Sequence, residues 1–336
     1  MRYCRPEQTI REASMGSQRT FAGLAWSDKR KVTRRERFLA EMNAVIPWAD
    51  LVALIAPHYP KPQRGRPPMP LETMLRIYFL QQWFDLSDPA AEDALYDSES
   101  MRRFVGLELS DDAVPDETTI LHFRHLLQQY RLTERMFDAV RGLLETKGML
   151  LKAGTIVDAS IINAPSSTKN ATATRDPEMK QTRKGKMWHF GMKVHVGTDL
   201  RGLVHSVTTT HAAEADIGQL PHLLHGEERA LYGDRAYWSE PDRAACEAAG
   251  IAYRVNRRGT HHHPVSPRWR QINRARSRVR ARGEHAFHVV KTLWRFTKVR
   301  YRGLAKNTAR IFTLFALSNL YMVRYQLGAR QATCLL

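Results

Sequence analysis

One glutamate stands alone among positive charges in the last third of this chain. Residues 268–310 contain fourteen Lys or Arg residues and a single acidic residue, Glu284. Solvated charged helices normally mix both signs, because acid–base pairs three or four residues apart stabilise them. An isolated carboxylate in such a basic segment therefore indicates a metal ligand or a catalytic group on a surface that binds a polyanion. The alternative is a structural ion pair with Arg280, four residues earlier.

Two aspartates upstream offer partners for this glutamate, because both follow short β-like runs. Asp158 ends the run 155–158 (TIVD), and Asp234 follows residues 230–233 (ALYG). Side chains at strand ends converge on a site that a rigid sheet holds in place. Together with Glu284 they would form a pocket of three carboxylates, whose mutual repulsion a pair of divalent cations relieves. An aspartate at the end of a strand is, however, most often a turn former or a helix cap.

A pocket of this kind is suited to phosphoryl transfer. Carboxylate oxygens bind Mg²⁺ or Mn²⁺ in preference to zinc. Two such ions, about 3.5–4 Å apart, stabilise both the attacking and the leaving oxygen of an in-line displacement. The three carboxylates therefore predict a metal-dependent enzyme that acts on a phosphodiester backbone.

Helical spacing in the segment after Arg274 separates its charged residues from its apolar residues. Arg280, Glu284 and Lys291 fall on one stripe, because they are four and then seven residues apart. A second stripe would pack on the sheet, and it comprises Gly283, Phe287, Val290 and Trp294. We therefore expect one helix that buries an apolar face while its glutamate reaches the metals and its cations reach phosphates.

The overall charge of the chain agrees with a polyanionic partner. The 336 residues carry a formal net charge of +18, and the pI is about 10.1. Such an excess attracts nucleic acid over long range. A membrane surface is the competing partner, but neither end shows a lipidation motif or a basic amphipathic anchor. The longest apolar run, residues 311–323, is too short to span a bilayer and is expected to form a buried helix.

Cysteine spacing and the polar N-terminus indicate a cytoplasmic protein. Cys4, Cys246 and Cys334 are far apart and lack metal-ligand spacing, so we expect free thiols in a reducing compartment. The first residues do not form the apolar segment of a signal peptide. Either Met1 or Met15 is the expected start of translation.

Changes in sequence pattern divide the chain into four regions. Residues 1–28 lack apolar periodicity and are expected to form a flexible arm. Residues 29–148 have helical periodicity, interrupted by a basic, proline-rich connector at 59–68, and predict a DNA-binding or dimerisation region. Residues 149–326 mix strand-like and helical runs, which predicts an α/β domain, and residues 327–336 form a tail.

Within these regions several elements are predicted individually. Short β-branched or apolar runs predict strands at residues 154–162, 190–197, 203–210, 229–232 and 251–255. The lysine-rich segment 166–187 predicts a loop, and residues 239–249 predict a helix. Asp116 is the expected N-cap of a helix in the helical region, for which a plain structural bundle is the alternative.

Four sequence motifs follow one another along the chain. The first two are residues 157–169 (VDASIINAPSSTK) and residues 188–195 (WHFGMKVH). The third is residues 233–237 (GDRAY), and the fourth is the helix with Arg280, Glu284 and Lys291. In this order they resemble the DDE transposases of bacterial insertion sequences, in particular the insertion-sequence-five family. The resemblance extends from about Phe21 to Tyr325, which is nearly the whole chain.

The resemblance implies a ribonuclease-H-like catalytic core, a mixed sheet flanked by helices, after an all-helical N-terminal domain. It implies that Asp158, Asp234 and Glu284 form a triad that binds two Mg²⁺ ions, replaceable by Mn²⁺, with Asp158 touching both. The implied reaction is hydrolysis at the ends of a mobile element, followed by attack of the freed 3′-hydroxyls on a target strand. The family signature has a tyrosine three residues before its arginine, whereas this chain has Ser277.

Basic residues near the predicted site are the expected DNA contacts. Arg280 and Lys291 are assigned to the DNA backbone, which positions DNA without reading its sequence. Further candidates for DNA contacts are Lys193, Arg276 and Arg295. The sequence neighbours His211, Glu214 and Asp216 would either support the site or pair within a loop.

Double-stranded DNA is the expected partner, both as the terminal inverted repeats of the element and as the target. Because two ends must be paired before joining, we expect a homodimer or a larger assembly on DNA, associated with the bacterial nucleoid. Two alternatives remain: a ribonuclease-H-fold nuclease that cuts DNA without joining it, and a DNA-binding derivative without chemistry. A basic RNA-binding protein would explain the charge but not the three acids.

Overall fold

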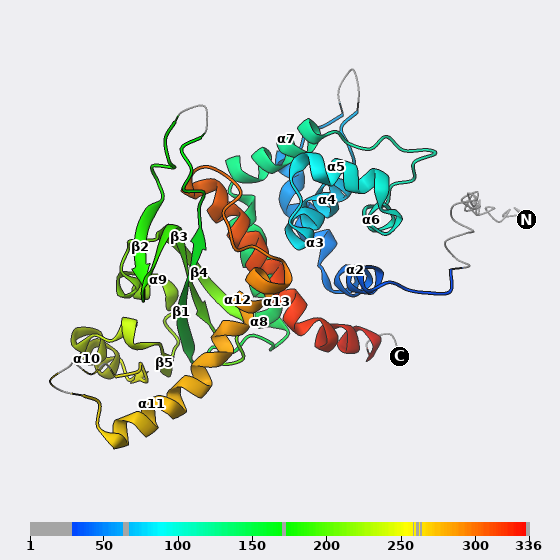
Figure 1. Ribbon diagram of the computed structural model, residues 1–336. Coiled ribbons are helices and arrows are strands. Elements are labelled where there is room, and N and C mark those ends of the chain that lie inside the picture. The colour runs from blue at the N-terminus through cyan, green and yellow to red at the C-terminus, as the bar shows by residue number, and fades with distance from the viewer. Residues whose placement is uncertain are drawn as a thin grey trace, which may run out of the picture.

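The computed structural model describes residues 29–62, 67–169, 173–257, 259, 262 and 264–333 of the protein. Its first half is helical, and its second half is a mixed sheet flanked by helices (Figure 1). This arrangement confirms the predicted fold class. The expected N-terminal arm, residues 1–28, lies outside the described residues.

The helical half is a bundle of short helices with well-defined starts. Its elements are α2 (Arg34–Val45), α3 (Trp48–Ile55), η1 (Ala56–His58), α4 (Leu71–Phe84), α5 (Asp88–Asp97), α6 (Glu99–Val105), α7 (Glu117–Gln129) and α8 (Leu132–Thr146). Thr33 and Glu36 form a capping box at the start of α2. The carboxylate of Asp116 accepts a hydrogen bond of 2.7 Å from the backbone N–H of Thr119, which confirms the predicted cap of α7.

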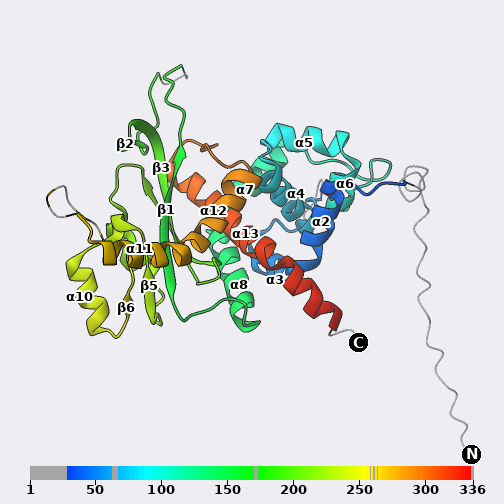
Figure 2. The same cartoon turned by 60° about the horizontal axis from the view of Figure 1, so that its bottom comes forward.

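The last helix, α13 (Leu304–Thr333), joins the two halves into one core. It lies between the sheet and the helical half (Figures 1 and 2) and packs against α2, α8 and β4 (Val204–His211). The hydroxyl groups of Thr313 on α13 and Tyr78 on α4 are 3.0 Å apart, and Arg310 donates to Asp85 at 2.8 Å. The expected burial of residues 311–323 is confirmed. The helix continues past residue 326, and one hydrophobic cluster includes residues of both halves.

The sheet has ribonuclease-H-like topology. Its strands are β1 (Thr155–Asn163), β2 (Lys180–Lys184), β3 (Met187–Thr198), β4, β5 (Ala230–Tyr232) and β6 (Ala252–Tyr253). Strand β3 is antiparallel to β1, β2 and β4, whereas β5 is parallel to both β1 and β6. The three long strands β4, β3 and β1 form a rigid centre, to which the two short parallel strands are added on the side of β1.

One sequence-based expectation about strands was wrong, and one predicted strand is shorter than expected. The predicted loop 166–187 contains β2, which pairs with β3 in a hairpin although all its side chains are at least partly exposed. The predicted strand 251–255 is reduced to the two residues of β6. In both cases pairing with a neighbouring strand, and not the apolar pattern, decides where the strand begins and ends.

Successive residues of β1 face opposite layers of helices. Ile156 packs with Val279 of α11 (Pro267–Arg280), which runs across one face of the sheet with α12 (Glu284–His288) (Figure 2). Val157 packs with Leu223 of α9 (Leu220–Leu223) and Cys246 of α10 (Glu240–Ala248) on the opposite face. This alternation places Asp158 on the α11–α12 face, because side chains two apart on a strand share a face.

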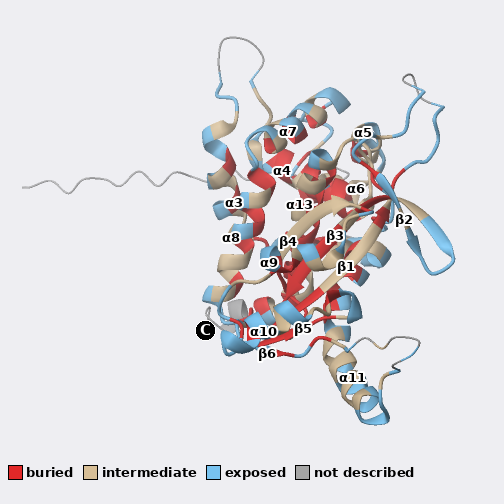
Figure 3. Ribbon diagram, turned by 90° about the vertical axis from the view of Figure 1, so that its left-hand side faces the viewer, coloured by how far each residue is buried: buried red, intermediate tan, exposed pale blue. Residues whose placement is uncertain are grey.

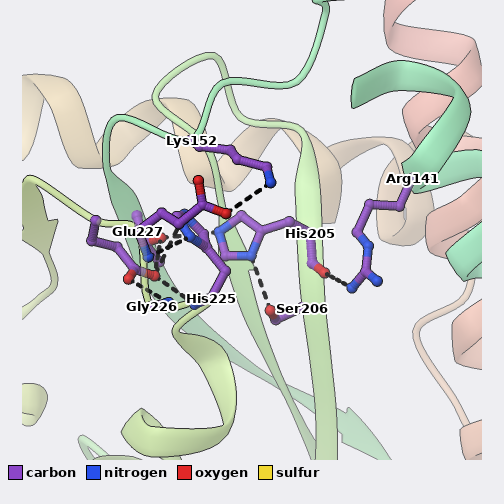
Figure 4. Close-up of polar contacts among 9 residues, drawn as sticks. Arg141, Lys152, His205, Ser206, His225, Gly226 and Glu227 are labelled. Carbon is purple, nitrogen blue, oxygen red and sulfur yellow. Dashed lines mark hydrogen bonds and ion pairs between the residues drawn. The ribbon is translucent and has the colours of Figure 1, made fainter. Parts of the chain in front are cut away.

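A buried polar network fixes the start of β1 to its neighbours. The hydroxyl of Thr155 donates to Glu228 at 3.0 Å and lies 3.1 Å from Nε2 of His205 on β4. The other groups around His205 are shown in Figure 4, where the backbone carbonyl of His205 accepts from Arg141 and its ring lies beside that of His225. Burial lowers the pKa of His205 to about 4, so the imidazole is neutral at pH 7.

Among the described residues, no single helix has both the length and the apolar composition to cross a membrane. Taken together, α2 and the α3–η1 segment have the length and the apolar composition of a membrane span, but they are bent by 71° relative to each other.

Candidate active site

The strand register places the two aspartates side by side. Strands β1 and β5 are parallel, with Ile156 opposite Tyr232, so a further step of two residues along each chain reaches Asp158 and Asp234. Neighbouring strands lie about 4.8 Å apart. Asp234 follows the end of β5 and caps η3 (Arg235–Tyr237), since its Oδ1 accepts a hydrogen bond of 2.8 Å from the N–H of Ala236.

The expectation that Asp158 ends its strand was wrong. Asp158 is the fourth residue of β1, which remains paired with β3 as far as Asn163. The neighbouring strand β5 ends near Asp158, because it pairs with β1 only at Thr155 and Ile156. One edge of β1 is therefore without a neighbouring strand from Val157 to Ile162, until Asn163 pairs with Lys298 in an isolated bridge.

A cavity of about 510 Å³ follows this open edge of β1. Its wall includes the carboxylates of Asp158, Asp234 and Glu284, which come from a strand, a strand end and a helix. The same wall includes Arg280 and Lys193. The structure thus brings together all three acidic residues singled out in the sequence.

Gly283 allows the helix that carries Glu284 to lie close to the sheet. A Cβ atom at this position would be 3.0 Å from Cγ2 of Ile156 and 3.3 Å from the hydroxyl of Thr198. Ile156 is two residues before Asp158 on the same face of β1, so this contact fixes how near Glu284 approaches Asp158. A side chain at position 283 would move the helix away from the sheet.

Arg280 is the cation that lies between two of the carboxylates. Its Nη2 is 2.8 Å from Oε1 of Glu284, and its Nη1 is 3.7 Å from Oδ1 of Asp158. The structural ion pair considered for Glu284 is thus present. Because 52% of the Glu284 side chain is exposed, its carboxylate can exchange this partner for another cation at little cost.

Burial makes Asp158 an unfavourable place for an unpaired negative charge. Its pKa is raised to about 6, first by burial, which Arg280 opposes, and further by the nearby charges of Asp234 and Glu284. Only 16% of the side chain is exposed. A cation of higher charge than a single guanidinium would stabilise the ionised form at this position.

The predicted single helix around Glu284 changes pitch three times. Helix α11 leads into a 3₁₀ turn, η4 (Ala281–Gly283), then into α12, and then into the π-helical turn η5 (Val289–Leu293). Its predicted apolar stripe is nevertheless buried. The altered pitch brings Lys291 over β1, where its amine donates to Oγ of Ser160 at 2.9 Å and to the carbonyl of Ile161 at 3.0 Å. Lys291 therefore satisfies part of the open edge of β1.

The remaining predicted DNA contacts occupy three different surroundings. Lys193 lines the cavity, where its amine lies 2.8 Å from Asp216. Arg276 donates to the carbonyl of Val255 at 2.7 Å, and burial lowers the pKa of its guanidinium. Arg295 is exposed and lines a separate hollow next to the helical half. Of these three residues, the structure brings only Lys193 to the carboxylates.

Two further residues of the cavity wall had little or no signal in the sequence. For Asp216 the sequence left two possibilities, support of the site or pairing within a loop. The structure places Asp216 in the cavity with Lys193. Tyr237 is 1% exposed, and its hydroxyl has no hydrogen-bond partner within the described parts of the chain. Burial, and then the charges of Asp216 and Asp158, raise the pKa of this phenol. Its place in the GDRAY motif was the only sequence signal for Tyr237.

Ser277 occupies the position of the signature tyrosine and contacts the protein itself. Its hydroxyl accepts a hydrogen bond of 2.9 Å from the side-chain amide of Asn256, which ties α11 to the segment after β6. The departure from the family signature thus coincides with a contact within the protein.

The donor groups of the cavity fit divalent metal ions in chemical type. All three predicted ligands are carboxylates, and the buried Asp158 lacks a close counter-charge other than Arg280 in the described structure. In this conformation no three His, Cys, Asp or Glu side chains among the described residues are placed to hold one ion together. Arg280 lies between Asp158 and Glu284, so an ion held by both carboxylates would require Glu284 to leave the guanidinium.

Comparison with known protein families agrees with this site. Residues 150–320, about half of the chain, match the model of the transposase DDE domain. The chain belongs to the DDE transposase family. Residues 27–126 also match a transposase domain (DUF772), which falls in the helical half. DDE transposases generally use divalent metal ions, and they act on DNA.

A solved structure with detectable similarity is the crystal structure of the Mos1 strand transfer complex. It shares 14% sequence identity with this transposase, and the match covers 82% of this chain and 80% of that chain. The TM-score is 0.28.

Proposed function

We propose that Asp158, Asp234 and Glu284 are the catalytic carboxylates of this transposase and bind two Mg²⁺ ions, for which Mn²⁺ can substitute. The observation that carries this proposal is their position in one cavity along the open edge of β1. When bound, the ions would stabilise the charge on the attacking and leaving oxygens of a phosphodiester. The protein would supply the fixed positions of the ligands, two from the sheet and one from a helix that Gly283 holds close to it.

The basic residues would then place DNA against this site. Arg280, once released by Glu284, has a guanidinium inside the cavity that can contact a phosphate. Lys193 lies on the same wall. Lys291 already uses two of its three donors on Ser160 and Ile161, so we assign it mainly to holding β1, with one donor left for the DNA backbone.

Helix α11 extends this DNA surface away from the cavity. It projects from the body of the protein (Figure 3), none of its residues is buried, and six of its fourteen residues are arginines. Arg276 lies on this helix, whereas Arg295 would meet DNA nearer the helical half. Phosphate contacts of this kind give affinity without base specificity.

We further propose that this enzyme belongs to the insertion-sequence-five family and moves its own element. Residues 29–148 would bind DNA or mediate dimerisation, and residues 149–326 would carry the catalysis. The assembly on DNA would be a homodimer or larger, because two element ends must be held together. The net charge of +18 favours association with the nucleoid in the cytoplasm.

The proposal is tested by a joining assay with single charge-removing substitutions. Labelled DNA that carries an end of the element is incubated with a target plasmid and Mg²⁺ or Mn²⁺. Joined product is expected from the wild type and from Glu240→Gln, a matched change at a carboxylate of α10 that is 63% exposed. Asp158→Asn, Asp234→Asn and Glu284→Gln are expected to form none.

Other results of this assay would change the conclusion. Cleavage by the wild type without joining would favour a nuclease of the same fold. Joining by Glu284→Gln at the wild-type rate would show that Glu284 is not the third carboxylate.

A further inference from the structure

The β2–β3 hairpin presents two adjacent apolar side chains to solvent. Met187 and Trp188, the first residues of β3, are each 65% exposed. Elsewhere in the described chain, no two sequence neighbours are both large, apolar and this exposed. Exposure of an indole to water is unfavourable, and no packing within the protein offsets this cost for Trp188.

The hairpin holds this pair in a fixed place. Five residue pairs join β2 to β3, from Lys180 opposite Gly191 to Lys184 opposite Met187. Pairing therefore continues to the turn, and Arg183 also donates to the carbonyl of Gly185 at 3.1 Å. Farther along β3, His189 lies 3.2 Å from the side chain of Asn163 at the end of β1. The hairpin is thus a paired extension of the central strands.

Positive charge surrounds the exposed pair. Residues 180–190 contain four cationic residues and no acidic residue. All four are exposed, and they are Lys180, Arg183, Lys184 and Lys186. An apolar pair inside a cationic surface matches nucleic acid, whose phosphates attract the cations and whose bases offer faces for stacking. A protein partner with an apolar groove would need acidic groups around it to suit the same hairpin.

The same hairpin borders the catalytic cavity on one side and a second hollow on the other. Arg183 and Lys184 line the cavity with the carboxylates. Trp188, Asn163 and Lys298 line the second hollow, which has a volume of about 510 Å³. Val196 of β3 lies opposite Asp158, and Trp188 is eight residues from Val196 on the same strand, which corresponds to about 27 Å. DNA that passes from the carboxylates along β3 would reach Trp188 after about eight nucleotides at 3.4 Å each.

We propose that Trp188 stacks on a nucleobase that leaves the duplex about eight nucleotides from the scissile phosphate. This inference rests on the proposed function, because it takes the position of the scissile phosphate from Asp158, Asp234 and Glu284. The cations of the hairpin hold the DNA backbone, Met187 adds apolar contact, and the hollow beside Trp188 accepts the displaced base. The hairpin thereby fixes the register of the DNA end relative to the carboxylates.

Photocrosslinking in EDTA tests the contact without any chemistry at the carboxylates. DNA ends carry one 5-iododeoxyuridine at each of about ten positions on either side of the cleavage point, and the crosslinked peptide is identified by mass spectrometry. We expect crosslinks to the peptide that contains Trp188 from positions about eight nucleotides away. Asp158→Asn is expected to crosslink equally well. Crosslinks only to other peptides would overturn the proposal.

Binding measurements with matched variants provide the second test. Trp188→Ala is expected to weaken binding of the DNA end about 5- to 150-fold, the range for loss of one stacked base. Trp188→Phe should restore most of it, and Tyr325→Ala, at a 65% exposed aromatic residue of α13, should change it little. Unchanged binding by Trp188→Ala would refute the stacking role. A changed oligomeric state with unchanged DNA binding would instead assign the hairpin to contact between copies of the chain.

The two proposals can fail separately. If Trp188 crosslinks as expected but no carboxylate variant alters the reaction with Mg²⁺, the proposed function fails and the DNA surface remains. If the carboxylate variants are inactive and Trp188→Ala binds and crosslinks like the wild type, only the stacking proposal fails.

Discussion

Replacing Asp158 by asparagine should stabilise the metal-free protein while it abolishes catalysis. The pKa of Asp158 is about 6 in the folded protein, against an ordinary value of 3.8, mainly because of burial. Because the pKa is higher in the folded protein, protonation of Asp158 favours folding. Its contribution to the free energy of unfolding is fully present below pH 3.8 and is lost as the pH rises to about 6. A shift of about two pKa units corresponds to about 3 kcal/mol. Asparagine is neutral and can still accept the hydrogen bond from the N–H of Ala159.

Urea unfolding in EDTA measures this effect at two pH values. At pH 8 the free energy of unfolding of Asp158→Asn should exceed that of the wild type by up to about 3 kcal/mol, and near pH 4 the difference should nearly vanish. Mg²⁺ at 1,000 times its Kd should reverse the order at pH 8, since it stabilises only the protein that binds it, by about 4.1 kcal/mol. A variant less stable than the wild type at pH 8 without metal would refute the electrostatic reasoning.

Three further predictions follow from contacts around the site. Gly283→Ala should destabilise the protein by about 1–3 kcal/mol in urea unfolding and reduce joining, because the new Cβ would lie 3.0 Å from Ile156. Unchanged joining would contradict the argument that Gly283 allows the helix to lie close to the sheet. Lys291→Met should cost about 1–3 kcal/mol, since two acceptors at the edge of β1 lose their donor. His195 and His205 have pKa values of about 4, so stability should fall as the pH drops from 6.5 towards 4, by up to about 3 kcal/mol for each. In an Asp158→Asn background, which removes the opposing titration, His205→Gln should flatten this slope, and an unaltered slope would exclude His205 as a cause.

Local sequence signals predicted the elements whose formation depends on their own residues. Ser239 caps α10 as the predicted helix at 239–249 requires, and the five predicted strands form with ends shifted by no more than three residues. The apolar stripe of the helix around Glu284 is buried because helical spacing fixes which side chains share a face. Asp234 likewise follows its strand directly, since β5 ends at the same place in the sequence and in the structure.

Features that depend on pairing with another element were not predictable from the local sequence pattern. Strand β2 reads KQTRK and lacks any apolar alternation, so only its pairing with β3 makes it a strand. Asp158 and Asp234 lie at the same height in the sheet because of the β1–β5 register, which no local sequence pattern encodes. The changes of helical pitch around Glu284 arise where the helix meets the sheet, and they bring Lys291 to an acceptor about 130 residues earlier.

The binding of two metal ions by Asp158, Asp234 and Glu284 is tested most directly by crystals of the full chain with a DNA end and Mn²⁺. Anomalous diffraction locates manganese without assumptions about its ligands. We predict two peaks about 3.5–4 Å apart, with Asp158 bound to both ions and Glu284 turned away from Arg280. Manganese held by other residues, or Glu284 still paired with Arg280 in a complex that joins DNA, would contradict the account.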